Sequence, residues 1–489
     1  MTGSLVLRGG RVIDPAAGTD TLADVLVDGD RVAAVGNGLV GDATLDVSDC
    51  IVGPGFVDLH SHVHSVAGQR LQALDGVTTC LDLEAGVMPV GKGYADAAAE
   101  GRPLHFGFSA SWASARGRIL AGVTPDADVH RSLALLGDPA WQRSSTPAEL
   151  AAWLDLLRAD VEDGALGVGV LLGYAPLSDP AEFLAVARLA AEAGVATYTH
   201  VRELVEADPS TPVDGSSELT RAAGETGARM HHCHVNSTSR RHIDRVLGTI
   251  ERSLAEGSRV TLEAYPYGAG STAVGASFLA PERLPAWGIG PDRIILLPSG
   301  ERIADWARLR EVRTEAPGTA CIVEYLDEDD PGDRELLRRS LLFPDSCVAS
   351  DAMPVYWPDG RVEDRSWPLP PGGSTHPRTA GTFCRALRTM VRDTGTWSWV
   401  EAFRRCSYLP AQVLDFVPAA RGKGRLDVGA DADIVVIDPE AVTDIATYLA
   451  PTTPSVGVRH LFVSGTAVVS GGRLVPDAYP GRPLRAEPR

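Results

Sequence analysis

Lysine is scarce in this 489-residue chain, and its cysteines follow no recognised pattern. Lys92 and Lys423 are the only lysines among 45 basic residues. The seven cysteines are scattered through the chain, and none are spaced as C-x-x-C. This spacing gives no sign of a disulfide framework or of a structural zinc knuckle.

The chain also lacks an excess of positive charge and any long apolar run. Its 45 Lys and Arg residues against 64 Asp and Glu residues give a net charge of −19. Nucleic acids and anionic membranes require a basic footprint, so neither is expected as a partner. No run approaches the ~18 apolar residues of a membrane helix, and the start MTGSLVLRGG lacks the apolar region of a signal peptide. We therefore expect a cytoplasmic protein.

Both ends of the chain alternate apolar and polar residues between Gly and Asp, which is typical of short strands. The N-terminal example is LVLRGGRVID, and the C-terminal example is GADADIVVID. Neither end has enough strands to be stable alone. We predict one composite β-domain from residues 1–56 and 416–489.

The middle of the chain, residues 57–415, alternates buried strand candidates with helical stretches. About eight such units predict the α/β class and a (β/α) barrel of parallel strands. Residues 268–345 are rich in proline and irregular, and they are too long for a plain loop. We predict an inserted, lid-like subdomain there.

Histidines gather at the ends of the strand candidates. His60 and His62 are two apart in GFVDLHSH (55–62), so both point to one face, where a metal ion can be held. Incidental histidines on a surface strand are the alternative. In ARMHHCHV (228–235), alternation favours His234 as a ligand and places His232 one step deeper, where it would support a ligand. His200 ends VATYTH, and a core histidine is the alternative there.

Two acids also end buried runs, where a carboxylate needs a partner. Asp351 ends CVASD, and Glu84 ends CLDLE. Each is a candidate metal ligand. A helix cap for Asp351 and a salt bridge for Glu84 are the structural alternatives.

These segments resemble those of the amidohydrolase superfamily and, within it, of the N-acyl-D-amino-acid deacylases, which include D-aminoacylases and N-acyl-D-glutamate deacylases. GFVDLHSH resembles the first-strand H-x-H of the superfamily. YPYGAGST (265–272), SDAMP (350–354) and HPRTAGTF (376–383) are similar to this branch. The resemblance covers nearly the whole chain. It implies a metal-bearing (β/α)8 TIM barrel with a β-sandwich domain formed by both termini.

The resemblance also implies a metal centre, with one departure from many superfamily members. Those members bridge two metals with a carboxylated lysine on the fourth strand, but GALGVGVLL (164–172) has no lysine. D-aminoacylases place a cysteine in the second-strand segment, where the matching neighbourhood of this chain is Leu83-Glu84-Ala85 and Cys80 lies four residues before Glu84. We therefore expect Glu84 to bridge or ligate the metal. The expected ligands are His60, His62, Glu84, His200, His234 and Asp351. One or two Zn²⁺ ions are implied, with Mn²⁺ or Co²⁺ as alternatives.

Asp351 is expected to act as the general base and acid, and Arg378 to clamp a substrate carboxylate through two hydrogen bonds. By resemblance, Tyr265 and Ser271 would help to hold that carboxylate. Where D-aminoacylases have a lysine after the sixth-strand histidine, this chain has Asn236. Further candidates are Arg202 and Arg116 for a second acidic group of the substrate, and Asp82 as a residue that orients a ligand.

The expected function is hydrolysis of a C–N bond in a small molecule, with an N-acyl-D-amino acid, including N-acyl-D-glutamate, as the first candidate substrate. Hydrolysis of a cyclic amide or imine, as in dihydroorotases and hydantoinases, is the alternative. A metal-free, non-catalytic scaffold is the alternative of another class. The sequence does not define the oligomeric state, and a homo-oligomer is one alternative.

Overall fold

The chain is described here from a computed structural model, which describes residues 3–128, 135–136, 138–297, 299–361 and 364–487. It divides into two compact units. The first unit comprises Met1–Leu81, Ala97–Phe106 and Cys347–Leu484, and the second comprises Asp82–Asp96, Gly107–Ser346 and Arg485–Arg489. Within the described ranges, no helix has the length and apolarity to cross a membrane.

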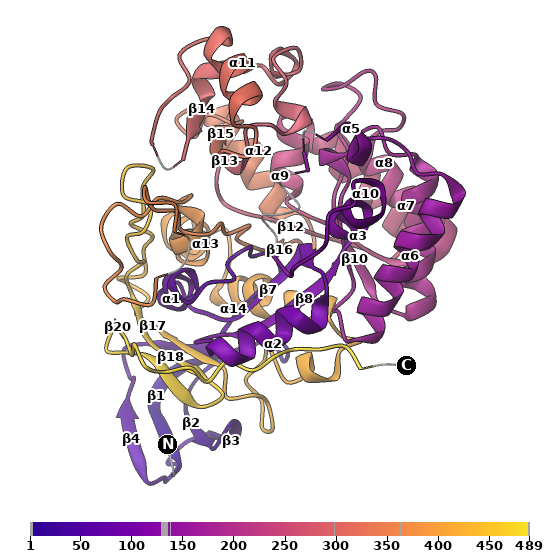
Figure 1. Cartoon of the computed structure of the whole chain (residues 1–489). Coiled ribbons are helices and arrows are strands. Elements are labelled where there is room, and N and C mark those ends of the chain that lie inside the picture. The colour runs from indigo at the N-terminus through magenta and orange to yellow at the C-terminus, as the bar shows by residue number, and fades with distance from the viewer. Residues whose placement is uncertain (1–2, 129–134, 137, 298, 362–363, 488–489) are drawn as a thin grey trace. The chain divides into compact units, whose positions relative to one another are not determined.

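Strands from both ends of the chain build one nine-stranded sheet in the first unit. Its order is β20-β19-β18-β17-β5-β1-β2-β3, and β4 pairs with β1. The strands are β1 (Leu5–Asp14), β2 (Thr19–Asp28), β3 (Arg31–Gly36), β4 (Ala43–Asp46), β5 (Ile51–Pro54), β17 (Ile434–Ile437), β18 (Val458–Val463), β19 (Thr466–Ser470) and β20 (Arg473–Leu474). The N-terminal and C-terminal parts meet where β5 pairs antiparallel with β17. Figure 1 shows these indigo and yellow strands in one sheet. The predicted joining of both termini in one β-structure is confirmed.

Eight strands form the barrel sheet, in the order β16-β12-β11-β10-β9-β8-β7-β6. They are β6 (Phe56–Asp58), β7 (Val77–Val87), β8 (His105–Ser111), β9 (Val168–Leu171), β10 (Ala196–His200), β11 (Arg229–His232), β12 (Val260–Ala264) and β16 (Cys347–Val348). The registers of β6 with β7, and of β8 through β12, are parallel. Just beyond β6 and β16, Ser61 and Ala352 form a parallel bridge, which brings the first and last strands together. The predicted (β/α)8 barrel is confirmed.

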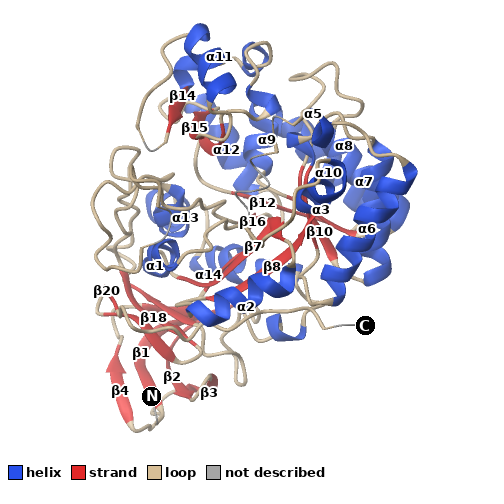
Figure 2. Cartoon of the chain, in the orientation of Figure 1, coloured by secondary structure: helices blue, strands red, loops and turns tan. Residues whose placement is uncertain are grey.

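Helices alternate with the barrel strands along the chain, and Figure 2 shows them in blue against the red strands. The helices are α1 (Val66–Leu74), α2 (Val90–Glu100), α3 (Trp112–Leu120), α5 (Pro139–Gln142), α6 (Pro147–Glu162), α7 (Pro180–Ala193), α8 (Gly215–Thr226), α9 (Val235–Ser239), α10 (Ile243–Ala255), α13 (Arg378–Leu387), α14 (Trp399–Phe403) and α15 (Leu409–Val413). Helix α6 begins where the sequence predicts, because Thr146 and Glu149 form a capping box. Helix α7 ends at Gly194, whose positive φ of 70° suits glycine.

A separate three-stranded antiparallel sheet lies within residues 268–345, with the order β13-β15-β14. Its strands are β13 (Ala269–Ala273), β14 (Ile294–Leu296) and β15 (Ala320–Glu324), and the same stretch contains the helices α11 (Trp306–Glu315) and α12 (Pro331–Leu342). Ala269, Leu297 and Ile322 pack together as a small apolar cluster at this sheet. The bounds predicted for the domains and for a lid stay a prediction.

Candidate metal centre

Three of the predicted ligands come together in the first unit. His60 and His62 follow β6, and Asp351 follows β16. The Nε2 atoms of His60 and His62 lie 3.2 Å apart. Asp351 Oδ1 lies 3.4 Å from His60 Nε2 and 3.6 Å from His62 Nε2. All three side chains are buried. Two imidazole nitrogens and one carboxylate oxygen therefore converge on one point.

Asp58 supports this group of ligands through hydrogen bonds. It is the last residue of β6, and its Oδ1 accepts a hydrogen bond from the backbone N of Ser350 (3.0 Å). Its Oδ2 also accepts one from Gln72 Nε2 (2.7 Å) on α1. Because Ser350 precedes Asp351, the bond fixes the segment that carries Asp351. Asp351 itself has a positive φ of 50°, a conformation that costs energy in a non-glycine residue.

Three further predicted ligands come together in the second unit. Glu84 lies on β7, His200 ends β10, and His234 lies between β11 and α9. Glu84 Oε1 is 3.1 Å from His200 Nδ1 and 2.7 Å from His234 Nε2. The two imidazole rings are 4.7 Å apart and nearly perpendicular. A single carboxylate oxygen thus faces a nitrogen of each ring.

Neighbouring groups set the orientation of both histidines. Ser237 Oγ lies 3.1 Å from His234 Nδ1, which leaves His234 Nε2 directed at Glu84. A Cβ at Gly173 would come within 2.5 Å of His200 Cδ2, so only glycine allows the ring this position. The rings of Tyr174 and Phe278 lie 4.8 Å and 5.6 Å from that of His200. Aromatic side chains therefore enclose His200.

The donor atoms of each group lie close together. Ligand atoms about 2.1 Å from a tetrahedral zinc lie roughly 3.4 Å from one another. The distances in the first unit, 3.2–3.6 Å, fit this value, whereas those in the second unit, 3.1 and 2.7 Å, are shorter and correspond to hydrogen bonds. Imidazole nitrogen with carboxylate oxygen suits Zn²⁺, Mn²⁺ and Co²⁺. The residues present therefore fit the expected metal.

Arg378 lies in the first unit beside the ligands, at the start of α13. It is fully buried, and its Nη2 lies 2.9 Å from Asp351 Oδ1. The next residue, Thr379, accepts a hydrogen bond from the backbone N of Met353 (3.0 Å), which joins α13 to the segment of Asp351. The guanidinium of Arg378 is thus held next to the predicted general base.

The other predicted substrate residues lie in the second unit. The ring of Tyr265 lies 6.4 Å from that of His234. Ser271 lies on β13, where its hydroxyl donates to the carbonyl oxygen of Cys321 (3.0 Å). Asn236 is buried, and its Nδ2 donates to the hydroxyl oxygen of Tyr325 (2.7 Å) and to the carbonyl oxygen of Tyr265 (3.2 Å). Asn236 therefore joins the segment of His234 to the tyrosines after β12.

Arg202 and Arg116, which were predicted to bind a second acidic group, are both buried in internal ion pairs. Arg202 Nε lies 2.7 Å from Glu218, and its other nitrogens donate to Pro176 and Ser178. Arg116 pairs with Glu182 and donates to the carbonyl oxygens of Trp141 and Arg143. Both side chains are 0% exposed. These contacts serve the fold, so neither arginine is included in the proposed substrate site.

The two residues predicted to support the ligands have defined partners. His232 lies 3.0 Å from Ser216 Oγ on α8, and burial lowers its pKa to about 3. Asp82 accepts hydrogen bonds from the backbone N of Ala85 (3.3 Å) and Gly86 (3.1 Å), which follow Glu84. Asp82 therefore shapes the backbone beside Glu84.

The sequence analysis missed Glu263, a buried residue on β12. Glu263 Oε2 lies 3.1 Å from His231 Nε2, and Oε1 accepts a weak hydrogen bond from the backbone N of His234 (3.4 Å). An acid inside the apolar run RVTLEAYPY (259–267) was a signal that could have identified it. Glu263 links β12 to the turn that carries His234.

Known proteins are similar to the chain over nearly its whole length. It is 30% identical to an N-acyl-D-glutamate deacylase of Alcaligenes xylosoxydans xylosoxydans, over 99% of this chain and 96% of the relative. It is 29% identical to a D-aminoacylase of the same organism, over 95% of this chain and 94% of the relative. The solved structure of N-acyl-D-glutamate deacylase from Bordetella bronchiseptica, complexed with zinc and a phosphonate inhibitor, matches with a TM-score of 0.74 at 26% identity, over 99% of each chain.

Similarity to cyclic-amide hydrolases is more limited. A dihydroorotase of Streptococcus thermophilus is 47% identical over 60 residues, which is 12% of this chain and 14% of the relative. No protein-family model matches the sequence. Among these sequence relatives, the deacylases match nearly the whole chain. The solved structure of a D-hydantoinase from Thermus sp. matches the fold over 99% of each chain, with a TM-score of 0.59 at 16% identity.

A (β/α)8 barrel with histidine and carboxylate donors at its strand ends defines the class of this protein, a metal-dependent amidohydrolase. Sequence identity over nearly the whole chain assigns the protein to one family within this class. The chain belongs to the family of N-acyl-D-amino-acid deacylases, together with the N-acyl-D-glutamate deacylase and the D-aminoacylase described above.

Proposed function

We propose that the protein hydrolyses the amide bond of an N-acyl-D-amino acid with the help of bound metal. The proposed metal ligands are His60, His62, Asp351, Glu84, His200 and His234. Each of the two groups brings imidazole nitrogens and a carboxylate oxygen together, and each stands at strand ends of the barrel sheet. Active sites of such barrels gather at the carboxyl ends of the strands. Zinc is the first candidate metal, since the Bordetella relative is complexed with zinc.

The observation that carries the proposal is the position of Asp351. Its carboxylate lies beside the nitrogens of His60 and His62 and also pairs with Arg378 at 2.9 Å. A bound divalent metal would polarise the scissile carbonyl and make an attacking water more acidic. Asp351 accepts a proton from that water at a carboxylate oxygen and then delivers it to the nitrogen of the leaving amine.

Arg378 is the proposed anchor for the α-carboxylate of the substrate. A guanidinium offers two parallel hydrogen bonds to a carboxylate, which a lysine ammonium cannot reproduce. The amide nitrogen of such a substrate is bonded to the α-carbon that also carries the carboxylate. Because Arg378 is held next to Asp351, a carboxylate bound by Arg378 places this nitrogen near Asp351, which must protonate it. Tyr265 is included in the proposed substrate site because its ring lies beside that of His234.

The contacts favour a neutral side chain on the substrate over the side chain of D-glutamate. A second carboxylate would need a second cation, and the guanidinium groups of Arg116 and Arg202 are occupied by Glu182 and Glu218. The aromatic rings of Tyr174 and Phe278 around His200 suit an apolar group instead.

A substrate panel tests the proposal. Metal-loaded protein is incubated with N-acetyl-D-methionine, N-acetyl-D-glutamate, their L-enantiomers, a hydantoin and dihydroorotate, and the released amine or opened ring is quantified. We expect D-selective deacylation, with N-acetyl-D-methionine preferred over N-acetyl-D-glutamate. Ring opening without deacylation would move the protein to the cyclic-amide hydrolases. Failure of the metal-loaded protein to hydrolyse any amide would refute the proposal.

As a control on the anchor, Arg378→Lys is compared with the wild type. The variant keeps the positive charge but loses the planar pair of donors, so KM for the preferred substrate is expected to rise roughly tenfold or more. An unchanged KM would remove Arg378 from the substrate site while leaving the hydrolase assignment in place.

A further inference from the structure

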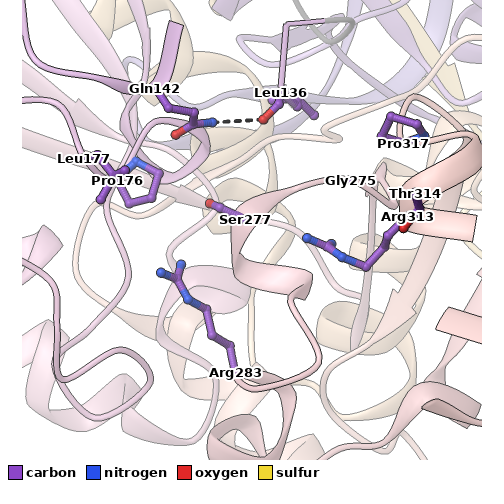
Figure 3. A pocket seen from close by; sticks show the side chains of 10 residues that line it. All are labelled: Leu136, Gln142, Pro176, Leu177, Gly275, Ser277, Arg283, Arg313, Thr314 and Pro317. Carbon is purple, nitrogen blue, oxygen red and sulfur yellow. Dashed lines mark hydrogen bonds between the residues drawn. The ribbon is translucent and has the colours of Figure 1, made fainter. Parts of the chain in front are cut away.

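The second unit contains a pocket of about 480 Å³ that is separate from the metal ligands. One wall comes from the segments around Gln142 and Pro176, and the other from residues 275–317 of the stretch with the three-stranded sheet. None of Glu84, His200 and His234 lines it. The volume lies within the range of sites for small molecules. Figure 3 shows the side chains that line the pocket.

Two arginines give this pocket its charge. Arg283 precedes a short helical turn, Leu284–Trp287, and Arg313 lies in the last turn of α11. In Figure 3 both side chains extend from their backbones toward the region where Ser277 lies. The described residues that line the pocket include no acidic residue. A basic pocket in a chain with a net charge of −19 concentrates small anions.

The charge of the two arginines is only partly compensated. Arg283 Nη2 pairs with Asp208 Oδ2 at 2.9 Å, but its Nη1 is buried and has no hydrogen-bond partner among the described residues. Arg313 donates from Nη1 to the carbonyl oxygens of Val274 (2.5 Å) and Ala276 (2.8 Å). Among the described residues Arg313 forms no direct ion pair, and the nearby carboxylate of Glu282 compensates part of its charge. A partly desolvated guanidinium without a direct ion pair is costly, and a bound anion would offset that cost.

The neutral polar side chains of the pocket are already engaged with the protein. Gln142 Nε2 donates to the carbonyl oxygens of Leu136 and Tyr174, and Ser277 Oγ donates to that of Gly173. The guanidinium groups are therefore the donors best placed for a ligand, and forked donors of this kind match oxyanions.

We propose that this pocket binds a small molecule bearing a carboxylate or phosphate group, held by Arg283 and Arg313. The inference does not depend on the proposed hydrolase function. The site borders two segments that pack on His200, since Ser277 precedes Phe278 and Pro176 follows closely after Tyr174. An anion bound here would thus contact the surroundings of a metal ligand without reaching the metal.

Calorimetric titration of the full-length, metal-loaded protein with inorganic phosphate and with succinate tests the site. The wild type is compared with Arg283→Gln and Arg313→Gln, and with Arg310→Gln as the matched control, because Arg310 is exposed on the same helix as Arg313. We expect Kd for at least one probe to rise roughly tenfold or more in the first two variants and to stay unchanged in the control. Binding of phosphate alone would identify a phosphoryl ligand, and binding of succinate alone a carboxylate ligand.

Because Arg313 also holds backbone carbonyls, its variant could fold poorly. Thr314→Glu provides the second test, since Thr314 is exposed and lines the pocket. A carboxylate placed there should repel the anion and raise Kd, and it removes only the exposed hydrogen bond from the Thr314 hydroxyl to the carbonyl oxygen of Arg310 (2.8 Å). Equal binding in all variants, or no binding of either probe to the wild type at millimolar concentration, would overturn the proposal.

Discussion

Replacing Asp351 with Asn separates its role in chemistry from its role in holding the metal. The amide keeps the shape of the side chain and an oxygen near the nitrogens of His60 and His62, which lie 3.4 and 3.6 Å from the carboxylate. The amide cannot accept the proton of the attacking water. We therefore expect turnover to fall about 10²–10⁴-fold, the contribution typical of a positioned general base.

The change in turnover converts to an activation free energy of about 2.7–5.5 kcal/mol. The assay measures kcat for N-acetyl-D-methionine and metal content on the same preparation, so that loss of metal is not mistaken for loss of the base. Asp359→Asn, an exposed aspartate in the same unit, is the matched control and should retain wild-type values. Metal retained with kcat within tenfold of the wild type would refute the assignment of Asp351 as the base.

Three further changes test other parts of the account. Ser237→Ala removes the hydroxyl beside His234 Nδ1, so metal affinity should fall roughly 10–100-fold in a chelator competition assay, and unchanged affinity would contradict this orienting role. Arg202→Met should lower the free energy of unfolding in urea by about 3–5 kcal/mol, because it leaves Glu218 buried without its partner, while KM of the folded enzyme stays unchanged; a raised KM with full stability would return Arg202 to the substrate site. Burial raises the pKa of Asp160 to about 6, above its unfolded value of 3.8. Ionisation is thus disfavoured in the folded state, and the free energy of unfolding should decline by up to about 3 kcal/mol as pH rises from about 4 to 6. Asp160→Asn keeps the acceptor for the backbone N of Val90 and should remove that decline in urea titrations at pH values on either side of the window, whereas an identical decline in the variant would contradict it.

The sequence predicts much of this fold because the strongest local signals agree with the final packing. The run GFVDLHSH places His60 and His62 on one face, and both imidazoles do converge. Helices α6 and α7 follow their capping residues closely. The observed elements differ from the predicted ones mainly at the ends of the strands. β6 stops at Asp58 and β11 at His232, so His60, His62 and His234 lie after the strands and not on them.

His234 shows why the turns were harder to predict. Its φ of 30° is positive, and alternation along a continued strand does not describe such a residue. The role of His234 as a metal ligand stays a prediction, and in the structure its Nε2 lies 2.7 Å from Glu84 Oε1. Backbone detail at a metal ligand depends on neighbours such as Ser237 and Glu263, which no local pattern connects to it.

The arginines show a kind of contact that the sequence does not predict, for a physical reason. Arg202 lies two residues after His200, and a spacing of two suggested a shared face. Its partner Glu218 lies on α8, and the partner of Arg116, Glu182, lies 66 residues further along the chain. Whether a buried arginine meets a carboxylate of the fold or of a substrate is decided by such distant pairings, which only the folded chain reveals.

The measurement that tests the central claim most directly is the metal content of purified wild-type protein, Glu84→Gln and His60→Asn, determined by mass spectrometry together with turnover. The account predicts bound metal in the wild type, and a loss of both metal and turnover in each variant, because each substitution removes a proposed metal ligand. Wild-type protein that deacylates without bound metal, or either variant with full metal content and full turnover, would contradict it.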